Sequence, residues 1–201
     1  MAKQKILGTF LRTLQYLSLN CVVVASAAWA ECDFDRDILL SLSQHEFDQN
    51  PDNGWRLLAK QPDCEAQAAD LIAAFREKHQ SSDGILFWHE GQLRATINQT
   101  EQALQLFSQS RKPAGQDIFG WNLYVDATIA FLRQDKASLL QARESLARLP
   151  KPADLNLSDD KGNPVDIPWP LNLDVVDRLV ACFGQSYTTA YGYCESAREK
   201  P

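Results

Sequence analysis

Residues 85–110 read ILFWHEGQLRATINQTEQALQLFSQS, and this stretch decides the fold class of the chain. Its apolar residues recur at helical spacing, at Leu86 and Leu93 in the first half and at Leu104 and Phe107 in the second. This spacing is the period of an amphipathic α-helix. A polar Asn-Gln-Thr sequence separates the two halves. The stretch therefore predicts two antiparallel helices joined by a short connection.

The same periodicity continues along most of the chain, and no segment shows the sustained alternation of a β-strand. We therefore predict an all-α fold made of antiparallel helical hairpins. Asp63, Asp83, Thr100, Asp135 and Asn172 each precede a helical pattern and are expected to cap it. The expected helices lie around Phe34–Leu42 and Trp55–Leu58, from residue 64 to His79, at Ile85–Asn98, after Thr100, at Asp117–Arg133, after Asp135, after Asn172 and around Tyr187–Cys194.

The first thirty residues are typical of a secretory signal peptide. They carry three basic residues and no acidic one, followed by an apolar run from Leu14 to Ala28. Small residues at Ala28 and Ala30 suit a signal peptidase, which predicts cleavage after Ala30. An uncleaved anchor is the alternative, because the run approaches the lower limit for a membrane span. Residues 1–30 are thus expected to be a cleaved leader, and 31–201 a single helical domain.

Composition restricts the function of the mature chain. Loss of the leader removes Lys3, Lys5 and Arg12, so the formal net charge moves from −6 to −9. An acidic chain lacks the basic surface of a nucleic-acid-binding protein and has little attraction for anionic membranes. Beyond the leader we find no second run that could span a bilayer. We expect a soluble exported protein, located in the periplasm if the source is bacterial.

Four cysteines follow the leader: Cys32, Cys64, Cys182 and Cys194. An even number in an exported chain predicts two disulfides, for which sequence alone allows three connectivities. We favour the local pairs, Cys32 with Cys64 and Cys182 with Cys194. The cysteines lack a C-x-x-C arrangement, and no metal or other cofactor is expected.

Residues 150–170 differ in composition from the rest of the chain. They hold five of the nine prolines, interleaved with Asn, Asp and Gly. We expect a loop before the last two helices that packs on the fold through Val165, Ile167 and Trp169. A functional lid is the alternative, because structureless runs of this length are uncommon inside a domain.

Two small residues repeat at the same place in successive hairpins. Gly91 and Ala127 are 36 positions apart, and each falls where the two helices of a pair must approach closely. Ala103 and Phe107 follow Gly91 by twelve and sixteen residues. This order of small, small and aromatic residues is that of a tetratricopeptide repeat.

Residues 85–149 therefore resemble a pair of tetratricopeptide-like hairpins. The second copy departs from the pattern, because Leu139 and Arg143 stand where a small and an aromatic residue are expected. Its period is also longer than the usual 34 residues. The resemblance implies a short solenoid of stacked hairpins, and an irregular helical bundle is the alternative.

In such a solenoid, the first helix of each pair lines a concave face that binds a protein or peptide. Aromatic rings interleaved with amide and hydroxyl groups would suit that role. The competing interpretation is that the aromatic residues belong to the core. The residues that the resemblance places on the concave face are Trp88, Gln92, Thr96, Trp121, Tyr124 and Thr128.

Catalytic chemistry has one candidate pair, His89 and Glu90. A partly buried Glu90 could act as a general acid or base, but an ion pair with Arg94, one helical turn away, is the simpler interpretation. A hydrolase site would require His45 or His79 close to Glu90. The sequence contains no nucleophile elbow, phosphate loop or dinucleotide fingerprint.

Three hypotheses follow for the function. The first is a non-enzymatic exported helical-repeat protein that binds a protein or peptide partner. The second is a disulfide-stapled inhibitor or immunity-type protein, which would present an ordered projecting loop in residues 150–170. The third is a hydrolase-like enzyme that uses His89 and Glu90.

Overall fold

A computed structural model describes residues 32–153, 155, 158, 162–165, 167–192 and 194. The described residues form helices and no strand; their β-structure is limited to an isolated bridge between Ser158 and Pro164. The prediction of an all-α fold is confirmed. The predicted signal peptide lies outside the described residues. Within them, no helix is both long and apolar enough to span a membrane.

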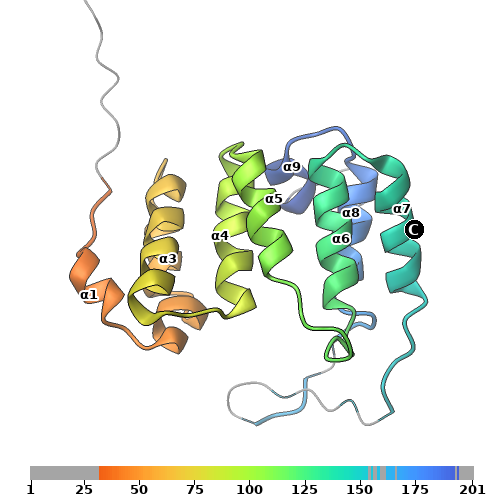
Figure 1. The fold of residues 1–201 in the computed structure, drawn as a ribbon, viewed down its shortest axis with the longest axis horizontal. Helices are drawn as coiled ribbons and strands as arrows, with labels where there is room; N and C mark the ends of the chain where they lie inside the picture. Colours follow the sequence, from red (N-terminus) through yellow and green to blue (C-terminus); the bar gives the residue numbers. More distant parts are fainter. Residues whose placement is uncertain are drawn as a thin grey trace, which may run out of the picture.

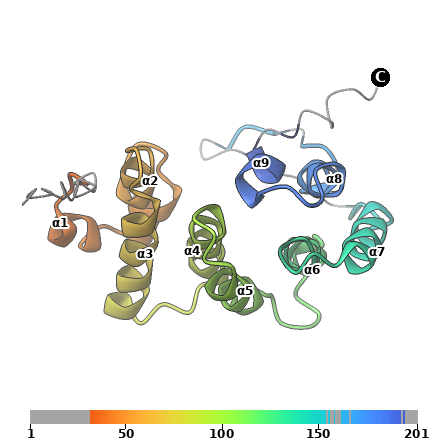
Figure 2. The same ribbon diagram turned by 90° about the horizontal axis from the view of Figure 1, so that it is seen from above.

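The helices follow one another as a row of pairs (Figure 1). α2 packs on α3, α4 on α5 and α6 on α7, while α3 also packs on α4 and α5 on α6. Seen from above, α8 and α9 lie together on one side of this row (Figure 2). The elements are α1 (Arg36–Leu40), η1 (His45–Gln49), α2 (Gly54–Ala59), α3 (Glu65–His79), α4 (Gly84–Thr96), α5 (Thr100–Gln109), α6 (Trp121–Leu132), α7 (Lys136–Ala147), α8 (Leu173–Ala181) and α9 (Tyr187–Gly192).

Two of the predicted helix caps are present. The carboxylate of Asp83 accepts a hydrogen bond from the Ile85 amide at the start of α4. The carboxylate of Asp135 does the same for the Ser138 amide at the start of α7. Each bond satisfies an amide that has no partner within its own helix, which is why these residues begin helices.

Of the other three predicted caps, those at Asp63 and Thr100 are wrong, and the one at Asn172 is confirmed in position only. Cys64 is the N-cap of α3 and Gln99 is that of α5, so Asp63 and Thr100 do not hold these positions. Asn172 is the N-cap of α8, but its side chain makes no capping bond. Asp63 and Asn172 both have a left-handed backbone, with φ of 60° and 62°. This differs from the extended backbone typical of an N-cap, in which the side chain can reach a helical amide.

The helix expected at Asp117–Arg133 begins later, at Trp121. Gly120 precedes it with a φ of +76°, a conformation that suits glycine and interrupts the helix. Asp117 nevertheless stabilises the helix start, because its two carboxylate oxygens accept hydrogen bonds from the Trp121 and Asn122 amides, each at 2.7 Å.

The close approach expected at Gly91 exists between α4 and α5. A Cβ atom at this position would lie 2.9 Å from two ring carbons of Phe107, which is fully buried. Glycine is therefore the residue that lets the Phe107 ring reach the α4 backbone. Ala127, the corresponding small residue of α6, is also fully buried.

Two apolar clusters form the core. One lies around Phe47, Leu71 and Phe75 at the amino-terminal end, and the other joins α4 through α9 around Phe107 and Phe131. α4 belongs to both, because Leu86 faces the first cluster and Trp88 the second. α4 thus links the two halves of the chain.

Both favoured disulfides are present. Cys32 is bonded to Cys64, and Cys182 to Cys194. The first bond joins the segment before α1 to the start of α3. The second joins the end of α8 to Cys194, which lies two positions after the end of α9. Two disulfides indicate an oxidising compartment, as expected for an exported protein.

The proline-rich segment packs less than expected. The Trp169 indole donates a hydrogen bond to the Leu149 carbonyl at 2.8 Å, and its ring contacts Phe119 edge-on. Val165 and Ile167, however, are exposed. The prediction that these two side chains pack on the fold is wrong, because the described part of the segment is held at its Trp169 end.

Candidate functional site

The aromatic residues predicted on a concave face form part of the core. Trp88 and Tyr124 are 3% exposed, and their ring centroids lie 4.6 Å apart. Trp121 packs edge-on against Trp88 and donates an indole hydrogen bond to the Ser110 carbonyl. These three side chains therefore join α4 to α6.

The polar residues of the same predicted face are also occupied. The hydroxyl of Thr96 bonds the Gln92 carbonyl, and the hydroxyl of Thr128 bonds the Tyr124 carbonyl, each one turn earlier in its own helix. Thr128 is 1% exposed. Such bonds to the preceding turn leave the hydroxyl less available to a partner.

The chain's own helix α9 covers this face. The Tyr187 ring is 4% exposed and lies 6.4 Å from the Phe107 ring and 6.5 Å from the Phe131 ring. The hydroxyl of Thr188 is 3.5 Å from the Thr96 carbonyl oxygen, to which it donates. α9 thus reaches side chains or backbone of α4, α5 and α6.

The pKa values of the tyrosines at this interface are raised by burial. Burial raises the pKa of the Tyr187 phenol far above its usual value, and interaction with Tyr191 raises it further, while the Gln92 side chain opposes the shift. Burial likewise raises the pKa of Tyr124, with smaller contributions from Tyr187 and Tyr191. These phenols are therefore neutral at physiological pH.

The six predicted residues do not form an open groove in this structure. Trp88, Tyr124 and Thr128 are buried, and Gln92, Thr96 and Trp121 are half-buried. The competing interpretation, that the aromatic residues belong to the core, is correct for Trp88 and Tyr124. Trp88 is enclosed by the rings of Phe107, Trp121 and Tyr124, and α9 packs over part of the same face. The docking of α9 could not be foreseen from the residues of α4 and α6.

The histidine of the candidate catalytic pair contacts another carboxylate. His89 Nδ1 lies 2.7 Å from Oδ1 of Asp48, which is fully buried in η1. The Trp55 indole donates to the same oxygen at 2.8 Å. Arg56 Nη2 lies 3.4 Å from His89 Nε2. A carboxylate oxygen can only accept a hydrogen bond, so Nδ1 of His89 carries the proton that it donates to Asp48.

Asp48 remains ionised at this buried position. Burial by itself would raise the pKa of the carboxyl. The hydrogen bond and charge of His89, together with hydrogen bonds from Trp55 and Gln49, outweigh burial and hold the pKa below its usual value. Asp48 therefore acts as the acceptor at the centre of this cluster.

Glu90 points away from His89 and joins α4 to α3. Its side chain is 6% exposed, and its two carboxylate oxygens contact different arginines: Oε2 bonds Arg76, and Oε1 lies 3.5 Å from Arg94 Nη2. The same Nη2 atom lies 2.6 Å from an oxygen of Asp70. The predicted ion pair with Arg94 is present, and Arg76 is a second partner that the sequence did not predict.

The other histidines lie apart from Glu90. The His45 side chain is 65% exposed beside Glu46, and His79 Nε2 lies 2.9 Å from the Leu40 carbonyl oxygen. The histidine partner that the hydrolase hypothesis requires for Glu90 is therefore not supplied by either residue. Within the described part of the chain, no cluster of His, Cys, Asp or Glu has the arrangement of a metal site.

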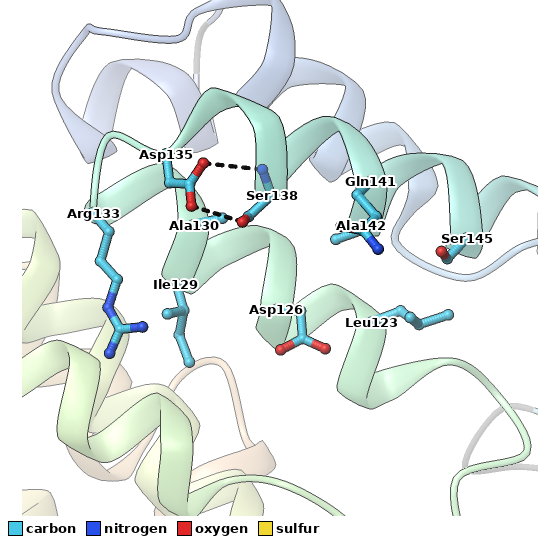
Figure 3. Close-up of a pocket in the computed structure, with 10 residues that line it drawn as sticks. All are labelled: Leu123, Asp126, Ile129, Ala130, Arg133, Asp135, Ser138, Gln141, Ala142 and Ser145. Carbon is cyan, nitrogen blue, oxygen red and sulfur yellow. Dashed lines mark hydrogen bonds between the residues drawn. The ribbon is translucent and has the colours of Figure 1, made fainter.

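An open groove lies between α6 and α7 (Figure 3). It has a volume of about 350 Å³. Its floor combines apolar side chains with polar ones along α7, and in Figure 3 the Arg133 side chain extends beside Ile129 at one end. The lining residues are Leu123, Asp126, Ile129, Ala130, Arg133, Asp135, Ser138, Gln141, Ala142 and Ser145.

Several polar groups of this groove have no bonding partner among the described residues. The side chains of Arg133, Gln141 and Ser145 make no hydrogen bond or ion pair with any described residue. Asp126, in contrast, is paired with Arg111, and Asp135 accepts from the Ser138 hydroxyl. Donors and acceptors are therefore available on the α7 wall and at the Arg133 end.

A second hollow adjoins the first at Arg133. It is lined by Glu101, Leu104, Gln105, Ser108 and Gln109 of α5, together with Arg133. The shared arginine makes the two hollows one surface across α5, α6 and α7, which we call the outer groove. The signal for this surface in the sequence was the set of glutamine and serine residues on α5 and α7. The sequence analysis favoured the aromatic residues of α4 and α6 as the binding face instead.

Comparison of this chain with protein-family models, curated proteins and solved structures found no match.

Proposed function

We propose that this chain is a non-enzymatic, exported helical-repeat protein that binds a segment of a partner protein in the outer groove. The observation that carries the proposal is the open groove between α6 and α7, in which the side chains of Arg133, Gln141 and Ser145 are unpaired among the described residues. Polar groups positioned on rigid helices and free of intramolecular bonds are suited to binding a ligand.

The proposal includes the tetratricopeptide-like arrangement of residues 85–149. Support comes from the α4–α5 and α6–α7 pairs, which follow one another in the row, and from the contact between Gly91 and Phe107. An array of paired helices presents an extended surface, which suits a partner segment better than a small molecule.

The mixed lining of the groove indicates how a partner would bind. Leu123 and Ile129 would contact apolar side chains, and Gln141 can both donate to and accept from a peptide backbone. The Arg133 guanidinium would pair with a carboxylate of the partner, because two parallel N–H donors match the two carboxylate oxygens.

Site-specific photo-crosslinking tests the proposal. A photoreactive amino acid replaces Gln141 in the outer groove, and the exported fraction of the source organism is irradiated with the full-length protein. Crosslinks to one discrete partner are expected at Gln141. The matched control is Glu77, which is exposed on α3 at the other end of the row and should give none of that partner.

A pair of arginine variants then tests the chemistry. Arg133→Gln is expected to weaken capture of the same partner about tenfold, as for loss of one charged hydrogen-bonded contact. Arg148→Gln removes the same charge just after the end of α7, where the Arg148 side chain is 77% exposed beside Glu144, and should leave capture unchanged. Equal capture by both variants, or equal crosslinking at Gln141 and Glu77, would show that the outer groove is not the binding surface.

A further inference from the structure

α9 has the side-chain pattern of a peptide helix bound in a groove. Within α9, Tyr187 and Ala190 are buried and Tyr191 is half-buried, at positions i, i+3 and i+4. Helical ligands dock in grooves through anchors at this spacing. Gly192 is exposed, so α9 turns one face to the protein and the other to solvent.

The surface under α9 belongs to three other helices. Tyr187 is placed against Phe107 of α5 and Phe131 of α6, while Thr188 bonds the backbone of α4 at Thr96. Tyr191 stacks on Tyr187, with ring centroids 5.4 Å apart. The receiving face therefore packs against the aromatic rings of α9 and accepts one hydrogen bond, from Thr188.

α9 is too short to be helical by itself. It spans six residues, and isolated helices below about 12 residues are marginal in water. Its helical form thus depends on docking and on its covalent attachments. One attachment is the turn after α8, and the other is the Cys182–Cys194 disulfide, which closes a loop with a sequence separation of 12.

We propose that the face formed by α4, α5 and α6 is a binding site for a short helix with tyrosines at positions i and i+4, and that α9 occupies it as a tethered ligand. The Cys182–Cys194 bond acts as the latch. Tethering at both ends gives α9 a high effective concentration, so a free helix of the same chemistry cannot compete. This proposal is independent of the outer groove.

A binding experiment tests the latch in the full-length chain. A fluorescent peptide of residues 185–195, with alanine in place of the cysteine, is added to the wild type and to the Cys182→Ala/Cys194→Ala variant. We expect saturable binding to the variant, at least tenfold tighter than to the wild type. The matched control is Cys32→Ala/Cys64→Ala, which removes the other disulfide and should resemble the wild type.

A second variant keeps both disulfides. Tyr187→Ala/Tyr191→Ala removes the anchors of α9 but leaves its tether, so the added peptide should bind where the wild type excludes it. If circular dichroism shows that the cysteine variant does not fold, the tyrosine variant tests the same proposal. A peptide carrying the same two tyrosine substitutions should bind neither protein.

Two results would overturn the proposal. One is the absence of peptide binding to folded variants whose α9 latch or anchors are removed. The other is binding that is equal for wild type and variants, or unchanged when the peptide loses its tyrosines, because the peptide would then occupy a different surface.

Discussion

His89 of α4 donates its Nδ1 proton to the buried carboxylate of Asp48 in η1, across 2.7 Å and 41 positions of sequence. The same carboxylate oxygen accepts the indole hydrogen bond of Trp55 in α2. Asp48 therefore joins η1, α2 and α4 through one acceptor, and its loss would leave the buried Trp55 indole and the half-buried His89 ring without this partner.

We expect Asp48→Ala to lower the free energy of unfolding by about 2–4 kcal/mol, because unpaired buried donors and a lost charge contact both destabilise the fold. Denaturant unfolding measures the change. Asp52→Ala is the matched control, since Asp52 forms an exposed pair with Lys60 that contributes less than about 1 kcal/mol. Similar losses in the two variants would contradict the central role of Asp48.

Acid should weaken the fold in part through Asp48. Its pKa is lower in the folded protein than the ordinary value of 3.8, so the folded state binds fewer protons than the unfolded chain in that interval. The stabilisation is therefore complete above the unfolded pKa and is lost as pH falls through the folded pKa.

Unfolding of the wild type and Asp48→Asn, measured from roughly pH 5 to pH 2, checks this linkage. We expect a shallower loss of stability in the variant, which lacks the titrating carboxyl. Glu46 and Asp135 also have lowered pKa values and are present in both proteins, so they do not affect the comparison. Parallel pH profiles would contradict the prediction.

Gly91→Ala should destabilise the protein although alanine is the better helix former. Helix propensity favours alanine by about 1 kcal/mol. The added Cβ, however, would lie 2.9 Å from the enclosed Phe107 ring, and overpacking of a core costs about 1–3 kcal/mol. The net change in unfolding free energy is expected to be a loss of up to about 2 kcal/mol.

The sign of the Gly91→Ala effect should reverse when the ring is removed. In a Phe107→Leu background the clash is relieved, so the alanine should stabilise the protein relative to glycine by up to about 1 kcal/mol. A double-mutant cycle with thermal unfolding measures this. The same sign in both backgrounds would show that the contact between Gly91 and Phe107 is not limiting.

Glu90→Gln should cost about 2–4 kcal/mol of unfolding free energy, because it leaves the largely buried Arg76 without its anionic partner. Arg94 retains Asp70, which limits the loss. Glu144→Gln, on the exposed surface of α7, is the control and should change stability by less than about 1 kcal/mol. A small effect at both positions would contradict the structural role of Glu90.

The helices were largely predictable because their signals are local. The spacing of Leu86 and Leu93 and the carboxylate of Asp83 operate within a few residues of the chain. The π-helical turn η1 was missed because its residues carry no apolar period. Trp121 was placed in the correct helix, but the glycine before it starts that helix later than the periodicity indicated.

The candidate site could not be predicted in the same way. Trp88 and Tyr124 have the side chains of a binding surface, yet both are buried in one core cluster with Tyr187, which comes from the other end of the domain. Arg133 gave no signal by itself, because an exposed arginine after a helix is common. Arg133 is a candidate binding residue because its side chain lines the outer groove, and that groove is formed only by the packing of the helices.

The sequence by itself determined the helical fold class, the order of the hairpins and, with the preference for local pairs, the two disulfides, because periodicity, capping and loop closure depend on residues near one another in the chain. Only the tertiary structure decided that α9 covers α4 and α6, that His89 pairs with Asp48 and that the open groove lies between α6 and α7. These features depend on how helices pack, and packing is set by contacts between residues that sequence spacing does not relate.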